Sequence, residues 1–221
     1  TPARLPDDKV EKDPWDAPDR GPLAVPGTYL VQLSKRVGGA ETALGEPQSF
    51  KVTPLGLATL ENKDKAAQLD FQQKVARLQR AVLAADEVVG DVKGRITLIK
   101  VALNVTPAAS GGLQGWVREL EKRLTEIDIA LSGDGEVAKR NEPTPPGIIE
   151  RVERIVWASW GATAAPTTTQ RDGYGIAADE FAEVLPKLKT LVETDLRQLE
   201  ESMEKAQAPY TPGRVPTWIK E

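Results

Sequence analysis

Residues 65–104, KAAQLDFQQKVARLQRAVLAADEVVGDVKGRITLIKVALN, decide how this chain of 221 residues folds. Apolar residues recur in this stretch mostly at steps of three and four, the spacing of one face of an α-helix. The stripe comprises Leu69, Val75, Leu78, Val82, Ala85, Val89, Val92, Ile96, Ile99 and Leu103. A helix of this length would measure roughly 60 Å. The sequence therefore predicts one long helix whose apolar stripe must be covered by other segments.

Two glycines, Gly90 and Gly94, lie inside this predicted helix. Each costs about 1 kcal/mol relative to alanine in a helix interior. We therefore expect a kink there, or a close approach of a neighbouring backbone. Asn62 or Asp64 is expected to cap the start of the helix, and residues 107–112 are expected to end it.

Three later segments have the same periodicity and could cover the stripe. Loops at 133–146 and 161–172 are expected to separate them, and Pro186 is expected to bend the last one near its first turns. Four amphipathic helices joined by loops pack most simply as a bundle. The three later helices are predicted at 113–131, 147–160 and 176–206.

The chain before the helices has a period of two, which is typical of strands. Strands are predicted at 27–34 and 48–53, with a turn at Gly38-Gly39 and a connection that extends as far as Pro47. Because two strands alone are marginally stable in water, we expect other strands to complete this hairpin. Its apolar side chains are Tyr29, Val31 and Leu33 on the first strand and Phe50 and Val52 on the second.

The predicted fold class is α+β, mainly α, with two parts. Residues 1–55 form a proline-rich linker and a small β hairpin or partial β-sandwich, and residues 56–221 form an antiparallel bundle of about four helices with a proline-rich tail. Trp15 in the linker and Trp218 in the tail are expected to anchor onto neighbouring surfaces, because buried tryptophan contributes a large apolar area.

Composition excludes several classes of function. The net charge is −4 with no strongly basic run, so nucleic acid is not an expected partner. The chain contains no histidine and no cysteine, which removes the usual zinc ligands and the usual general base. No apolar run approaches the roughly 20 residues of a membrane span. The first residues do not resemble a signal peptide, and the chain is expected to be a fragment or a processed product.

Candidate catalytic groups have simpler explanations. Ser159 lacks the Gly-x-Ser-x-Gly context and a histidine, so it is not expected to be a nucleophile. Gly133-Asp134-Gly135 follows a predicted helix rather than a strand, which favours a loop over a dinucleotide site. The carboxylates Glu119, Glu121 and Glu126 lie among basic residues, as on a solvated helix face. No catalytic, cofactor-binding or metal-binding residue is predicted.

A family resemblance is carried by residues 15–52. Trp15-Asp16, the stretch GPLAVPGTYLVQL at 21–33 and QSFKV at 48–52 resemble the C-terminal β domain of large bacterial sortilin-like proteins, also labelled glycosyl hydrolase or BNR-repeat proteins. In that family a β-propeller precedes an immunoglobulin-like β domain with a GP-x-x-x-PGTY-x-V-x-L stretch, and a helical segment follows. The order of predicted elements over residues 15–206 is similar.

This sequence departs from the family pattern in two ways. Thr53-Pro54-Leu55-Gly56 stands where the family continues into an Asp-Pro-Arg stretch. The propeller and its asparagine-box repeats are absent from this sequence, so the resemblance transfers no catalytic residue. What it implies is a setting outside the bacterial cytoplasm, in the periplasm, the envelope or the medium.

The leading hypothesis is a non-catalytic accessory or interaction module of a secreted or periplasmic β-propeller protein, docking through its β segment onto a protein partner or an upstream propeller. One alternative is the C-terminal part of a glycosidase-like hydrolase whose active site lies on the propeller. Another is a structural subunit of a cell-envelope complex. The predicted partner-binding residues are Trp15, Tyr29, Val31, Leu33, Phe50, Val52 and Trp218.

Overall fold

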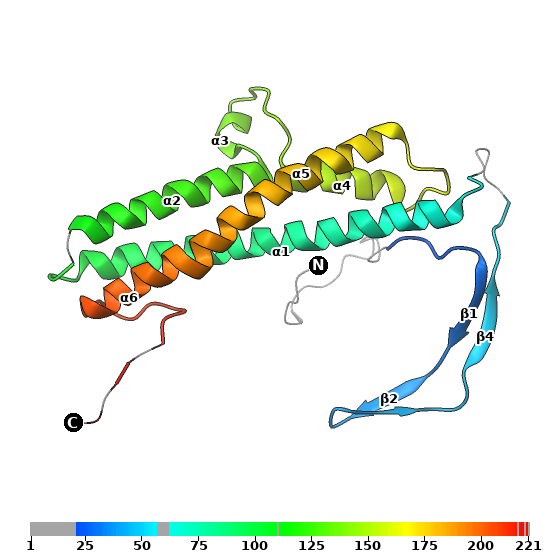
Figure 1. Cartoon of the computed structure of the whole chain (residues 1–221), viewed down its shortest axis with the longest axis horizontal. Coiled ribbons are helices and arrows are strands. Elements are labelled where there is room, and N and C mark those ends of the chain that lie inside the picture. The colour runs from blue at the N-terminus through cyan, green and yellow to red at the C-terminus, as the bar shows by residue number, and fades with distance from the viewer. Residues whose placement is uncertain (1–20, 57–61, 110, 216, 219, 221) are drawn as a thin grey trace.

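A computed structural model describes the chain except for residues 1–20, 57–61, 110, 216, 219 and 221. Long helices lie along one another, and a β hairpin stands to one side of them (Figure 1), which confirms the expected mainly α, α+β class. The strands are β1 (Gly27–Val31), β2 (Ser34–Val37), β3 (Ala40–Ala43) and β4 (Gln48–Val52). The helices are α1 (Lys65–Asn104), α2 (Gly111–Ser132), α3 (Gly135–Ala138), α4 (Ile148–Ser159), α5 (Thr168–Thr190), the π-helix η1 (Leu191–Leu196) and α6 (Arg197–Lys205).

The long helix α1 has the predicted bounds. Asp64 is its cap, because the Asp64 side chain accepts a hydrogen bond from the backbone N–H of Ala67 at 2.9 Å. Asn62 supports this cap by accepting a bond from the backbone N–H of Asp64 at 3.0 Å. The predicted stripe is buried apart from Leu69 and Leu78, which are half-buried.

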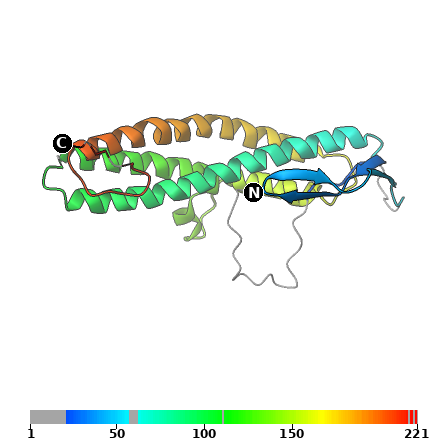
Figure 2. The ribbon, with the colours of Figure 1, turned by 90° about the horizontal axis from the view of Figure 1, so that it is seen from below.

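The helices form three rods that lie side by side (Figures 1 and 2). α1 is the first rod, α2 followed by α4 is the second, and the continuous helix from α5 through η1 to α6 is the third. A Cβ atom added at Gly147, just before α4, would lie 2.6 Å from the backbone oxygen of Leu131 in α2. Only glycine therefore fits where the two helices of the second rod meet. The rods share one hydrophobic core, which includes Ile99, Leu124, Val152 and Leu199.

Polar side chains of α1 hold the end of α4. Gln72 is 2 % exposed and donates a hydrogen bond from Nε2 to the carbonyl of Ser159 at 2.7 Å. Gln68 donates likewise to the carbonyl of Ala162 at 2.7 Å. The carbonyl of Ser159 also accepts a bond from the backbone N–H of Ala162 at 3.2 Å. The two glutamines therefore tie the start of α1 to the end of α4 and to the turn that follows it.

The prediction that residues 161–172 form a loop is wrong for its second half, since α5 begins at Thr168 rather than near residue 176. The Thr167 side chain accepts a bond from the backbone N–H of Gln170, whose side chain in turn accepts one from the backbone N–H of Thr167. This reciprocal pair is a capping box, and it fixes the start of the helix. Gly133-Asp134-Gly135 also differs from a plain loop, because Asp134 caps the short helix α3.

The third rod changes its winding after Pro186. The proline lies well inside α5, not near its first turns as predicted, and the Thr190 hydroxyl donates to its carbonyl at 3.0 Å. The π-helix η1 follows directly, and its two buried residues, Leu191 and Leu196, are five positions apart. That step matches the i→i+5 winding of a π-helix. The extra residue returns Leu199 to the core and leaves Val192 only partly buried.

The expected close approach of a neighbour at Gly90 and Gly94 is wrong. Both glycines lie on the exposed side of α1, and a Cβ atom added to either would meet no atom within 4 Å. Neither position therefore needs glycine for packing.

We predict that Gly90→Ala and Gly94→Ala each stabilise the protein by up to about 1 kcal/mol, because alanine is the better helix former and open space receives its methyl group. Chemical denaturation followed by helical circular dichroism measures the change. Gly147→Ala is the contrasting variant and should destabilise, since its Cβ would meet backbone atoms. Destabilisation at Gly90 or Gly94 would show that this side of α1 is not open.

Val82 and Arg80 test the orientation of α1. Val82 is 1 % exposed, whereas Arg80 is exposed to solvent. Val82→Asp should cost several kcal/mol, roughly 3 or more, because an unpaired carboxylate is buried in the core. Arg80→Ala should change the free energy of unfolding by less than about 0.5 kcal/mol. Equal shifts in thermal melts of the two variants would contradict the helix orientation.

Candidate protein-docking surface

Four of the five predicted hairpin residues lie on β1 and β4, whereas Leu33 follows β1. These strands pair antiparallel, with Tyr29 opposite Phe50, Gly27 opposite Val52 and Val31 opposite Gln48. Residues directly opposite one another project from the same face of a sheet, so Tyr29 and Val31 share a face with Phe50 and Val52. The rings of Tyr29 and Phe50 stack there with centroids 5.8 Å apart.

The first predicted strand, 27–34, ends at Val31, and the connection predicted to extend as far as Pro47 contains two further strands. β2 and β3 continue the hairpin to a tight turn at Gly38 and Gly39, whose φ angles of 57° and 85° suit glycine. Between the two paired segments, two residues of one strand, 32–33, oppose four of the other, 44–47. Such a bulge bends a ribbon, and Figure 1 shows the hairpin curving at this point.

Much of the hairpin's apolar surface is exposed. The exposed fractions are 73 % for Leu30, 55 % for Val31, 68 % for Leu33 and 49 % for Phe50. The main contacts of the strands are with one another, and the helical rods pack among themselves (Figure 1). The hairpin therefore buries little of the surface that would ordinarily stabilise a sheet.

Both edges of the hairpin are open within the described part of the chain. β1 pairs only with β4 there, and β2 only with β3. An edge strand presents a row of backbone N–H and C=O groups that can pair with another chain. Exposed apolar side chains beside unpaired backbone groups make this ribbon, here called the β ribbon (residues 27–52), the best candidate surface for docking.

Of the two predicted tryptophan anchors, the structure describes Trp218 alone. Trp15 lies outside the described residues. Trp218 is 80 % exposed and belongs to the C-terminal tail, which emerges at the opposite end of the bundle from the ribbon (Figure 1). Within the part of the chain that the structure describes, the predicted partner-binding residues thus form one group on the ribbon, with Trp218 remote from it.

A clamp that sequence reasoning missed fixes the tail to α6. Arg214 has a side chain only 3 % exposed, pairs with Glu204 at 2.5 Å, and lies over the ring of Tyr210 at 5.0 Å. Glu204 also accepts hydrogen bonds from Thr217 at 2.8 Å and from Tyr210 at 3.0 Å. The three donors, Thr217 foremost, hold the pKa of Glu204 below its ordinary value of 4.5.

The clamp should be sensitive to acid. Because the pKa of Glu204 is lowered in the folded protein, its contribution to stability is present above pH 4.5 and is lost as the pH falls below that value. We predict that Glu204→Gln lowers the melting temperature at pH 7 and that its difference from wild type shrinks below pH 4.5. Glu201→Gln, an exposed neighbour on α6, is the matched control and should change little. A pH-independent difference for Glu204→Gln would contradict the clamp.

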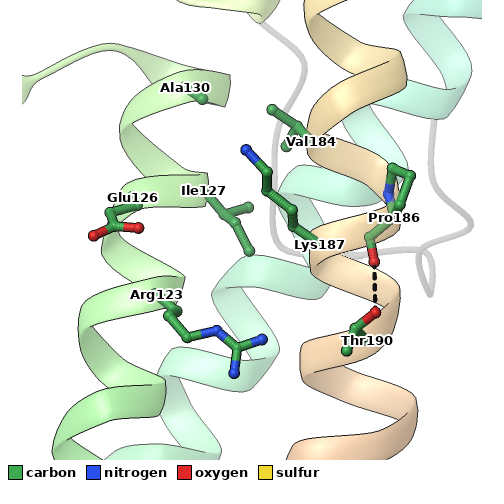
Figure 3. A pocket seen from close by; sticks show the side chains of 8 residues that line it. All are labelled: Arg123, Glu126, Ile127, Ala130, Val184, Pro186, Lys187 and Thr190. Atoms are coloured by element: carbon green, nitrogen blue, oxygen red, sulfur yellow. Dashed lines mark hydrogen bonds between the residues drawn. The ribbon is translucent and has the colours of Figure 1, made fainter.

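A shallow groove separates α2 from α5 (Figure 3). It encloses about 360 Å³ and is lined by Arg123, Glu126, Ile127, Ala130, Val184, Pro186, Lys187 and Thr190. Arg123 is already paired with Asp195 of η1 at 2.7 Å. Glu126 points away from Lys187, so the groove brings no acid and base together. Nothing in this arrangement supports catalysis.

The remaining candidates also lack catalytic geometry. Ser159 is 5 % exposed in the last turn of α4, and its buried Oγ has no hydrogen-bond partner among the described residues. Glu121 pairs with Lys100 at 2.9 Å on an exposed face. No cluster of three or more potential metal-ligating side chains occurs in the described ranges. Nor is any helix within them long and apolar enough to cross a membrane.

Comparison with known proteins identifies no relative: no family model, no curated protein and no solved structure matches this chain.

Proposed function

We propose that this chain is a non-catalytic interaction module that docks onto a protein partner through the β ribbon. The observation that carries the proposal is the combination of exposed apolar side chains with open strand edges. Leu30, Val31 and Leu33 are each more than half exposed, beside backbone groups that pair with no further described strand. Strand addition satisfies such groups and covers such side chains in one step.

The partner is proposed to supply strands that complete a sheet around Tyr29 and Phe50. Their stacked rings form one apolar face, and the main contacts of the strands are with one another rather than with the helical rods. A two-stranded ribbon gains independent stability only when further strands or another element cover it. The bundle is then the self-supporting part of the chain to which the ribbon is joined, since α1 is the next element after β4.

The resemblance of residues 15–52 to the β domain of sortilin-like proteins suggests the setting. In this proposal the completing strands come from an upstream propeller-associated segment or from a separate envelope protein, in the periplasm or outside the cell. The absence of histidine and cysteine supports a module without hydrolytic chemistry of its own.

Hydrogen exchange on the isolated chain tests the proposal. Amides of β1 and β4 should exchange fast whenever the chain is monomeric, because the ribbon opens easily without added strands. Amides in the middle of α1, around Val89, should exchange slowly in the same sample, because they lie in the core. Slow exchange across 27–31 and 48–52 in a monodisperse monomer would mean that the ribbon is complete by itself, and docking would lose its basis.

A further inference from the structure

The two edges of the β ribbon are not equivalent. Residues 27–33, which contain β1, form a run with no charged residue and no proline. The other edge carries a bulge at Gly45, a proline at Pro47 and the charge of Lys51 within β4. Bulges, prolines and lysines are the features that block pairing at natural sheet edges. Of the two open edges, the edge of β1 is therefore the one suited to an added strand.

The chemistry of this edge restricts what can pair with it. A strand next to β1 must be uncharged near its centre and must offer apolar residues at alternate positions, to match Tyr29 and Val31 on one face and Leu30 on the other. Among the described strands of this chain, β4 already pairs with β1 on its other side, and β2, β3 and β4 all carry charged residues, so β1 is the one strand without a charge.

We infer that β1 pairs antiparallel with β1 of a second copy of this chain, about a two-fold axis at Leu30. This inference rests on the proposed function, of which it names one partner. A two-fold interface is self-complementary, so each contact occurs twice. With the axis at Leu30, Tyr29 lies opposite Val31 of the second copy, and Thr28 lies opposite Gln32.

The direction of pairing follows from charge. Lys35 and Arg36 of β2 come soon after β1. In a parallel pair they would lie beside their own copies, which is destabilising. In the antiparallel pair centred on Leu30, Lys35 lies opposite Val25 and Arg36 opposite Ala24, so the positive charges stay apart.

The pairing produces a sheet of four strands, β4-β1-β1-β4, from two incomplete ribbons. Aromatic residues paired with β-branched residues are favourable across strands, and each Tyr29 gains such a neighbour in Val31 of the other copy. The stacked pair of Tyr29 and Phe50 in each copy then continues across the axis into one apolar face. A sheet of this size passes the threshold at which strands become independently stable.

A cross-link tests the register directly, because the chain has no cysteine of its own. Leu30→Cys places one thiol at the proposed axis, where it faces its copy on the same side of the sheet. Ser49→Cys is the matched control, since Ser49 lies directly opposite Leu30 across the ribbon and is also exposed. Under oxidised glutathione, Leu30→Cys should form disulfide-linked dimers and Ser49→Cys should stay mainly monomeric. Equal cross-linking of the two would overturn the register.

Sedimentation of the full chain tests the interface without a cross-link. Wild type should dimerise with rising concentration, Leu30→Lys should stay monomeric, and Ser49→Lys should dimerise like wild type. Both lysines replace exposed side chains, so neither should unfold the bundle. A dimer abolished by Ser49→Lys but kept by Leu30→Lys would place the interface on β4 and overturn the inference.

Exchange data on the same samples separate this inference from the proposed function. A wild-type monomer whose ribbon exchanges fast overturns pairing between copies and leaves docking to another protein standing. A wild-type monomer whose ribbon exchanges slowly overturns both. If dimerisation slows exchange in β1 of wild type and of Ser49→Lys, but not of Leu30→Lys, both the pairing between copies and the proposed docking function are supported.

Discussion

The burial of one face of α1 is the interaction on which the rest of the structure depends. This helix has 40 residues and contributes to the core from Val75 to Leu103. The third rod runs along it as one continuous helix from α5 to α6, whereas α2 and α4 are each too short to cover it and together form the second rod. Their junction requires the glycine at position 147, because a side chain there would meet the backbone of α2. The requirement for glycine at position 147 thus follows from the length of α1.

The same arrangement explains why two glutamines are buried near the start of α1. Gln68 and Gln72 lie on the buried side of α1 near its start, where an apolar stripe alone would place leucine or valine. They donate to the carbonyls of Ala162 and Ser159, at the end of α4 and in the turn after it. A buried amide left without such a partner would cost roughly 1–3 kcal/mol. These two bonds therefore allow polar side chains to lie on the buried side of α1 at its start.

How much could be predicted from the sequence depends on the range of the interactions. The bounds of α1 follow from its periodicity, and the sharing of a face by Tyr29 and Phe50 follows from alternation. The start of α5 was predictable in principle, since Thr167 and Gln170 form a recognisable capping box, but the small residues around it favoured a loop. The π-helix is marked in the sequence by the spacing of five residues between the apolar Leu191 and Leu196. A search for apolar residues spaced three and four apart does not detect it.

The clamp on the tail lay beyond sequence reasoning for a different reason. Glu204, Tyr210 and Arg214 meet only because the chain reverses after α6, and no periodic pattern marks that reversal. The hairpin itself was predicted, but its bulge was not. The bulge places residues 32–33 opposite residues 44–47, and the alternation of apolar and polar residues along one strand does not reveal such a mismatch. In both cases the unpredicted feature depends on how two segments meet rather than on either segment alone.

The molecule combines a helical bundle that buries its own apolar surface with a β ribbon that leaves much of its apolar surface exposed. The three rods bury their apolar faces against one another, whereas the β ribbon leaves residues such as Phe50 about half exposed. A rigid base carrying an incomplete sheet is suited to binding, because the free energy that the ribbon lacks is gained only when a partner covers it. This division between a self-sufficient bundle and a dependent ribbon is the central claim.

The most direct measurement is guanidinium unfolding of the monomeric full chain, followed by helical circular dichroism, with Tyr29 and Phe50 both replaced by serine. If the ribbon contributes nothing to the bundle, the free energy of unfolding and the unfolding midpoint should match those of wild type within error. A loss of several kcal/mol would contradict the claim, because it would show that the stacked rings support the helical core.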